Sequence, residues 1–86
     1  MTAEIVIYTK DYCPFCHRAK ALLDKLGQKY TEIDLQAQPD RRDEMIAKAG
    51  GKTTVPQVFI GGQHVGGCDD LFAAHNSGAL TKLLKS

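Results

Sequence analysis

The chain has 86 residues, 43% of them hydrophobic and 24% charged, and its 11 basic and 10 acidic side chains leave a formal net charge of +1. A chain this short can build one small core, which predicts a single domain over residues 1–86 with any ligand in a shallow surface groove. The absence of a basic stripe argues against nucleic acid as a partner. No apolar run reaches the length of a membrane span or a signal peptide, so we expect a cytoplasmic protein with no membrane contact.

The first third of the chain predicts a strand, a helix and a second strand. Residues 4–9 are nearly all apolar and rich in β-branched and aromatic side chains, as expected of a strand buried on both faces at the sheet centre. Residues 14–26 repeat apolar side chains at helical spacing, with Pro14 in the first position and Gly27 as the stop. Residues 30–35 alternate apolar and polar side chains, so a second strand should follow, parallel to the first.

The rest of the chain predicts a helix, a hairpin and two short helices. Glycine or proline bounds the first of these helices and both strands of the hairpin, and these residues most often interrupt regular structure. We expect a helix from Pro39 to Gly50-Gly51, antiparallel strands 57–60 and 63–66 joined by Gly61-Gly62, a short helix 69–75, and a last helix carrying Leu80, Leu83 and Leu84.

Three cysteines, Cys13, Cys16 and Cys68, are an odd number, and the first two lie only three positions apart. This spacing argues against a secreted disulfide framework and favours reactive thiols or a metal site. The first pair lies where strand 4–9 gives way to helix 14–26. Free N–H groups and the positive end of the helix dipole favour a thiolate there.

The helix dipole alone is too weak to activate the first thiol fully. It contributes about 0.3–2 kcal/mol, whereas lowering a thiol pKa from about 8.5 to about 5 requires roughly 5 kcal/mol. The remainder must come from hydrogen bonds to the sulfur and from a nearby cation, for which Lys10 is correctly placed. We expect the outer thiol, Cys13, to attack and the inner thiol, Cys16, to resolve. The alternative is a pair of packed, unreactive thiols.

Two further segments have a physical interpretation of their own. In Thr54-Val55-Pro56 the X-Pro bond can be cis at low cost, which would leave Val55 with a free backbone edge for an extended peptide; the alternative is a trans proline at the start of an edge strand. In residues 66–70 two glycines precede a helix whose free N–H groups could bind a carboxylate. Alternatively, Asp69 or Cys68 simply caps that helix.

Residues 9–16 (Thr-Lys-Asp-Tyr-Cys-Pro-Phe-Cys), 54–56 (Thr-Val-Pro) and 66–70 (Gly-Gly-Cys-Asp-Asp) resemble, in order and spacing, the dithiol glutaredoxins of the thioredoxin superfamily. The resemblance covers almost the whole chain. It implies an α/β, thioredoxin-like fold with a four-stranded mixed sheet ordered 2-1-3-4, helices on both faces, a cis Pro56 and a glutathione groove beside Cys13. Phe15 stands where tyrosine is frequent in the family, which keeps the aromatic wall of the groove.

The resemblance also implies how glutathione would bind. Lys10, or alternatively Arg42 on the second helix, would meet the glycine carboxylate, while the γ-glutamyl group would meet the N–H groups of Cys68 and Asp69 and the Asp69 carboxylate. Arg41, Arg42 and Lys48 are otherwise read as surface charges. The implied site comprises the catalytic Cys13 and Cys16 and the glutathione-binding Lys10, Phe15, Thr54, Val55, Pro56, Cys68 and Asp69, with no metal.

The function implied is glutathione-dependent reduction of glutathione mixed disulfides and of protein disulfides by a monomer, with ribonucleotide reductase as a plausible client. One alternative is a binding module for an iron-sulfur cluster or zinc, disfavoured by the single Cys-x-x-Cys and by Pro14. Another is a thioredoxin-like donor served by a reductase, disfavoured by the absence of tryptophan. The third thiol, Cys68, is either a small buried hydrophobe or a site of oxidation or glutathionylation.

Overall fold

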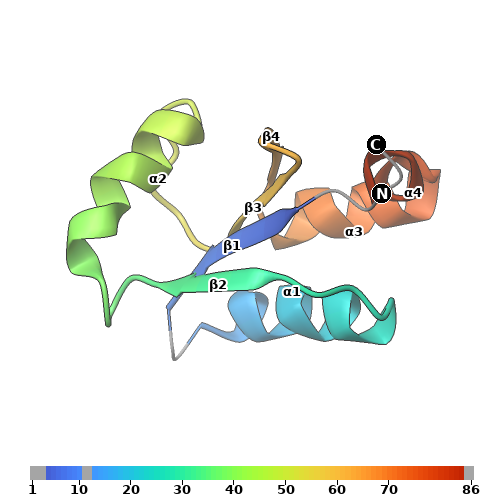
Figure 1. Ribbon diagram of the computed structural model, residues 1–86, viewed down its shortest axis with the longest axis horizontal. Coiled ribbons are helices and arrows are strands. Elements are labelled where there is room, and N and C mark those ends of the chain that lie inside the picture. Colours follow the sequence, from blue (N-terminus) through green and yellow to red (C-terminus); the bar gives the residue numbers. More distant parts are fainter. Residues whose placement is uncertain (1–3, 11–12, 85–86) are drawn as a thin grey trace.

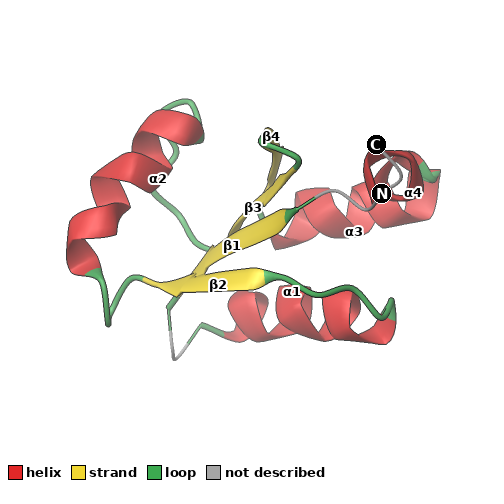
Figure 2. Ribbon diagram, in the orientation of Figure 1, coloured by secondary structure: helices red, strands yellow, loops and turns green. Residues whose placement is uncertain are grey.

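The computed structural model describes residues 4–10 and 13–84 and shows a four-stranded sheet with helices on both faces (Figures 1 and 2). This confirms the expected α/β architecture. The strands are β1 (Ile5–Thr9), β2 (Thr31–Asp34), β3 (Gln57–Ile60) and β4 (Gln63–Gly66). The helices are α1 (Pro14–Lys25), α2 (Arg42–Lys48), α3 (Cys68–Ser77) and α4 (Ala79–Leu84), and the 3₁₀ turn η1 (Pro39–Arg41) precedes α2.

The sheet order is β2-β1-β3-β4, as the resemblance implied. β1 lies inside the sheet, parallel to β2 and antiparallel to β3, which explains why its residues are apolar on both faces. β3 and β4 form the predicted hairpin, and Gly61 and Gly62 take the positive φ angles of 59° and 83° that its turn requires.

Two helices differ from their predicted extents. The helix expected from Pro39 to Gly50 is split, because its first turn is the tighter 3₁₀ form that often begins a helix. The third helix is longer than residues 69–75: it begins at Cys68 and ends where Gly78 adopts a left-handed φ of 86°. No helix in the described part of the chain is long and apolar enough to cross a membrane.

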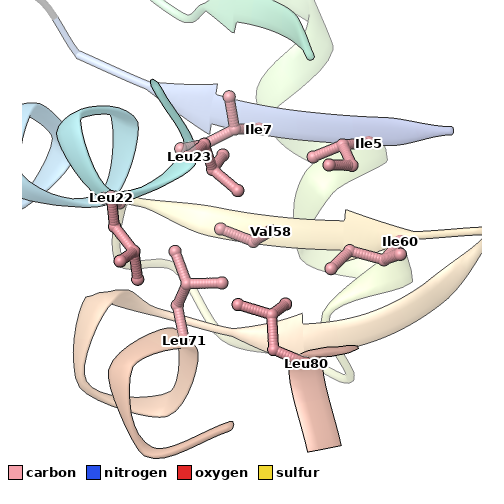
Figure 3. Packing of buried hydrophobic residues seen from close by; sticks show 9 residues of the cluster. Ile5, Ile7, Leu22, Leu23, Val58, Ile60, Leu71 and Leu80 are labelled. Atoms are coloured by element: carbon pink, nitrogen blue, oxygen red, sulfur yellow. The ribbon is translucent and has the colours of Figure 1, made fainter. Parts of the chain in front are cut away.

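One face of the sheet packs against α1, α3 and α4 (Figure 3). Isoleucines and a valine from β1 and β3 contact leucines from the three helices, and this layer fixes α1 and α3 on the same side. An additional contact joins the two helices at their surface, where the Arg18 guanidinium lies 5.6 Å from the centre of the Phe72 ring. The labelled members of the layer are Ile5, Ile7, Leu22, Leu23, Val58, Ile60, Leu71 and Leu80.

The other face of the sheet packs against α2. The ring of Tyr8 meets Phe59 edge-on at 5.6 Å between centroids, and its hydroxyl donates a hydrogen bond to Glu44 of α2. Glu44 also forms ion pairs with Arg41 at 2.8 Å and Lys48 at 4.0 Å. These two cations, read from the sequence as surface charges, are therefore paired with a carboxylate. Burial and the bond to Glu44 raise the pKa of Tyr8 to about 12.

Replacing Tyr8 by phenylalanine should lower the free energy of unfolding near neutral pH by about 1–2 kcal/mol, because Glu44 loses a buried donor. The pKa of Tyr8 is raised in the folded chain from 10.0 to about 12, so the unfolded chain loses its phenolic proton first as the pH rises. The contribution of the phenol is complete below about pH 10 and disappears between pH 10 and 12. Urea unfolding of both proteins at increasing pH measures the difference. A difference that stays constant through this range would contradict the assignment.

Candidate active site

Cys13 and Cys16 lie at the start of α1 with very different exposure. Cys13 is the N-cap, in extended conformation, and Pro14 follows in the first helical position as predicted. Cys13 is half-buried, whereas Cys16, one turn into the helix, is completely buried at 0% exposure. The expected asymmetry of an outer and an inner thiol is confirmed.

The surroundings of the two thiols give them different chemistry. Burial raises the pKa of the Cys16 thiol to about 12, and a hydrogen bond with Cys13 adds to this effect, while a bond with the backbone of Lys10 opposes it. Cys16 is therefore a neutral thiol at neutral pH. The Sγ atom of Cys13 points instead to the carbonyl oxygen of Val55, 3.8 Å away. Cys13 is the more accessible of the two thiols, and its role as the nucleophile stays a prediction.

A network of polar side chains joins β1, β2 and α1. Glu32 accepts hydrogen bonds from the Thr9 hydroxyl at 2.6 Å and from the Lys20 ammonium at 2.9 Å. Burial favours the neutral acid, but these two bonds outweigh it and lower the pKa of the Glu32 carboxyl. Thr9 is itself completely buried at the end of β1, so the network fixes the strand end from which the chain runs to Cys13.

The loop before β3 presents its backbone to Cys13. The Val55–Pro56 bond is cis, as the resemblance implied, and the alternative of a trans proline is wrong. β3 begins only at Gln57, and the Val55 carbonyl faces the Cys13 thiol. The side chain of Gln57 supports this loop by donating to the carbonyl of Thr54 at 2.9 Å.

The start of α3 corrects one interpretation of the sequence. Neither Asp69 nor Cys68 caps the helix, because the N-cap is Gly67 and Cys68 is already helical. The side chain that reaches back is that of Asp70, whose Oδ2 accepts from the N–H of Gly67 at 3.2 Å. An acid in the third helical position is well placed for this bond, so the carboxylate of Asp69 is left for other contacts.

A cleft of about 190 Å³ lies between the start of α1, the loop before β3 and the start of α3. Six of the seven residues expected to bind glutathione line it, and the seventh, Lys10, does not. Lys10 is half-buried, and its carbonyl accepts from the N–H of Cys13 at 3.3 Å. Its role as a ligand for glutathione remains a prediction. The lining residues are Phe15, Lys52, Thr54, Val55, Pro56, Gln57, Gly67, Cys68, Asp69 and Asp70.

Four lining residues were not expected: Lys52, Gln57, Gly67 and Asp70. Gly67 and Asp70 belong to the motif at residues 66–70, so a signal for them was present. Lys52 comes from the turn after α2, and no sequence pattern places it in the cleft. Lys52 adds a positive charge to a cleft that also contains the carboxylates of Asp69 and Asp70. This combination suits a ligand that carries both positive and negative charges.

Cys68 lines the cleft but is buried, and burial raises the pKa of its thiol. This environment favours the interpretation as a small buried hydrophobe over that of a reactive group. Phe15, by contrast, is 52% exposed and forms a wall of the cleft, as the resemblance implied. Among residues 4–10 and 13–84, no group of three or more His, Cys, Asp or Glu side chains is arranged to hold a metal ion.

Comparison with known proteins identifies the family. Residues 5–65 match the glutaredoxin family model. Glutaredoxin 3 of Escherichia coli K12 is 53% identical over 83 residues, which cover 96% of this chain and 99% of that protein. The solution structure of glutaredoxin from Brucella melitensis superposes with a TM-score of 0.83 at 50% identity, covering 98% of this chain and 90% of that one. The crystal structure of a buckwheat glutaredoxin–glutathione complex gives a TM-score of 0.88 at 38% identity over 96% and 77% of the two chains. The chain therefore belongs to the glutaredoxin family and is a thiol-disulfide oxidoreductase.

Proposed function

We propose that this protein uses glutathione to reduce glutathione mixed disulfides and, through its second thiol, protein disulfides. The observation that carries the proposal is a cleft lined by a loop backbone, a cation and two carboxylates, whose lining residue Val55 has its carbonyl oxygen 3.8 Å from the Cys13 sulfur. The buckwheat relative, with a TM-score of 0.88, was crystallised in complex with glutathione.

Glutathione would lie along the cleft as a short extended peptide. Val55 offers its backbone to the cysteinyl unit, which brings the glutathione sulfur against Cys13. The first turn of α3 offers N–H groups to the γ-glutamyl carboxylate, and the Asp69 carboxylate, which does not cap the helix, meets the ammonium group. Lys52, together with the predicted Lys10, supplies a cation for the glycine carboxylate.

The reaction follows ordinary thiol-disulfide exchange. The Cys13 thiolate attacks the glutathionyl sulfur of a mixed disulfide; a new S–S bond forms, the old one breaks, and the client leaves as a thiolate that takes up a proton. A second glutathione, as the thiolate, attacks the same glutathionyl sulfur. Glutathione disulfide leaves and the Cys13 thiolate is restored.

A protein disulfide takes a second route. Attack by Cys13 leaves a client joined to the enzyme, and Cys16 resolves it by forming the Cys13–Cys16 disulfide while its proton passes to the departing client thiolate. Because the pKa of Cys16 is raised to about 12, this step requires proton removal from a buried thiol. Two molecules of glutathione then reduce the disulfide.

The proposal takes residues 1–86 as a single domain that acts as a monomer in the cytoplasm, without a metal and without nucleic acid or membrane as partners. Its clients are glutathionylated or disulfide-containing proteins, including reductive enzymes such as ribonucleotide reductase. The hypothesis of an iron-sulfur or zinc module needs thiolate ligands beyond Cys13 and Cys16, which a glutathione-assisted dimer would have to supply. The remaining described cysteine, Cys68, is buried and lies in the cleft assigned to glutathione.

Glutathione-coupled reduction of a small glutathione mixed disulfide tests the proposal. The wild type should turn over, and Asp69→Asn should raise KM about tenfold with kcat within about twofold, because a charge-assisted bond to the bound ammonium is lost in both ground and transition states. Asp43→Asn, the same change at an exposed position on α2, is the control and should leave KM unaltered. Absence of turnover by the wild type would contradict the proposed function. Equal KM values for Asp69→Asn and Asp43→Asn would contradict the binding mode.

A further inference from the structure

Gln57 is a buried polar residue whose amide joins the edge of the sheet to the cleft. It is 1% exposed and begins β3. Its Nε2 donates to the Thr54 carbonyl at 2.9 Å and to the Thr54 hydroxyl at 3.3 Å. Its Oε1 lies 2.7 Å from Nε2 of His64 on β4. The chain of contacts therefore runs from His64 through Gln57 to Thr54, which lines the cleft.

The direction of each hydrogen bond between His64, Gln57 and Thr54 follows from the Thr54 carbonyl. The Thr54 carbonyl can only accept, so the NH₂ end of the Gln57 amide must face it. Oε1 is then turned to His64, and the short contact requires a proton on the His64 Nε2 atom. The His64 ring is held in this position by stacking on Phe59, with ring centroids 5.0 Å apart and planes inclined at 31°.

The same orientation sets the hydroxyl of Thr54. Its oxygen accepts one proton of the Gln57 amide, so its own proton is left to donate elsewhere. Thr54 is exposed and lines the cleft, which places that donor before a bound ligand. Hydrogen bonds arranged in such a chain polarise and strengthen one another.

We propose that Gln57 and His64 are positioning residues for glutathione, which fix the Thr54 hydroxyl as a hydrogen-bond donor to an acceptor oxygen of the bound tripeptide. The inference rests on the proposed function and adds two residues that act through Thr54. Neither touches the reacting sulfur atoms, so they set the affinity for glutathione and leave the chemical step unchanged.

Gln57→Glu tests the inference with almost no change of shape. A carboxylate keeps the contact with His64 but cannot donate to Thr54, so the Thr54 hydroxyl turns its proton inward to the new acceptor. KM for a small glutathione mixed disulfide should rise about tenfold, while kcat at saturation stays within about twofold of the wild type. Gln63→Glu, the same charge change at an exposed position, is the control.

A double-mutant cycle shows whether the effect passes through Thr54. Thr54→Val should raise KM about as much as Gln57→Glu does, whereas Thr54→Ser, which keeps the hydroxyl, should have the wild-type KM. The double variant Gln57→Glu/Thr54→Val should have a KM no higher than that of either single variant. Two substitutions at His64 give the second test, should the substitution at buried Gln57 impair folding. His64→Phe keeps a ring on Phe59 but removes the donor and should raise KM about threefold; His64→Gln, with a donor in the same place, should restore it.

The possible outcomes separate the inference from the function beneath it. Wild-type turnover with a Gln57→Glu variant of unchanged KM overturns the inference alone. A double variant whose KM rises by the product of the two single increases also overturns the inference, because Gln57 and Thr54 would then act independently. If the Gln57→Glu variant does not fold, equal KM values for His64→Phe and His64→Gln overturn it. Absence of wild-type turnover overturns the proposed function and the inference together.

Discussion

Serine in place of Cys13 should lower the turnover of a glutathione mixed disulfide by at least about 10³-fold, because no other thiol can replace the lost nucleophile. With a pKa of about 12, the Cys16 thiol is ionised at pH 7 to roughly one part in 10⁵. It is also completely buried, so a substrate sulfur cannot reach it. Cys68 is buried as well, and its pKa is raised. Steady-state turnover in the glutathione-coupled assay is the measurement.

Cys16→Ser is the matched control for this result. It removes the buried thiol but leaves Cys13 and the cleft in place, so turnover of the small mixed disulfide should stay within about threefold of the wild type. Reduction of a protein disulfide should fall much further, because the mixed disulfide with the client can no longer be resolved within the chain. Near-normal turnover by Cys13→Ser would refute the assignment of the nucleophile. Loss of both activities in Cys16→Ser would refute the single-thiol route.

Alanine in place of Gly66 should destabilise the fold by about 3 kcal/mol, the largest stability effect that we expect from a single methyl group. Gly66 has a φ of 124°, which is unfavourable for any residue with a Cβ. That Cβ would also lie 2.3 Å from Oδ2 and 2.8 Å from Cβ of Asp70. Rotation of the Asp70 side chain can move its Oδ2 but not its Cβ, so the first turn of α3 has to shift.

The shift should be visible in function as well as in stability. Asp70 would lose its bond with the N–H of Gly67, and the start of α3, which carries Asp69, would move away from the cleft. We therefore expect a higher KM for the mixed disulfide together with a lower urea midpoint. Gly62→Ala is the control, because Gly62 also has a positive φ, 83°, but no atom lies within 4 Å of the added Cβ. Gly62→Ala should lower the free energy of unfolding by only about 1–2 kcal/mol. Equal losses of stability in the two variants would show that the contact with Asp70 does not contribute.

The sequence was sufficient for most of the fold because most of its elements are defined by local patterns. β1, α1 and the hairpin of β3 and β4 each carry their own periodicity and their own stop signals. The cis state of Pro56 came from resemblance, since no local pattern distinguishes it from trans. The split of the second helix into η1 and α2 was missed, because the apolar spacing of the sequence does not report the tighter first turn.

The candidate site was predictable where its residues belong to motifs and was missed where the fold alone brings them together. Phe15, Val55 and Asp69 were expected from the motifs that surround them, and all three line the cleft. In the sequence, Gln57 is simply one residue of a predicted strand. Its hydrogen-bond partners are Thr54, in the loop before β3, and His64, on β4. Lys52 enters the cleft through the path of the loop before β3. Such placements depend on tertiary contacts that no local spacing encodes.

The pairing of β1 with β3 has a consequence for when the enzyme becomes competent. Cys13 follows β1, in a half of the chain that can be assembled from β1, α1 and β2, whereas Val55 and Asp69 flank the β3–β4 hairpin. The lining of the cleft comes from the second half except for Phe15, so the cleft meets the cysteine pair only when the two halves are paired. A nascent or partly opened chain that has only the first half therefore holds the cysteine pair without the residues proposed to bind its reductant. We therefore expect glutathione-dependent activity only when β1 and β3 are paired, so that activity would report on the integrity of the whole domain.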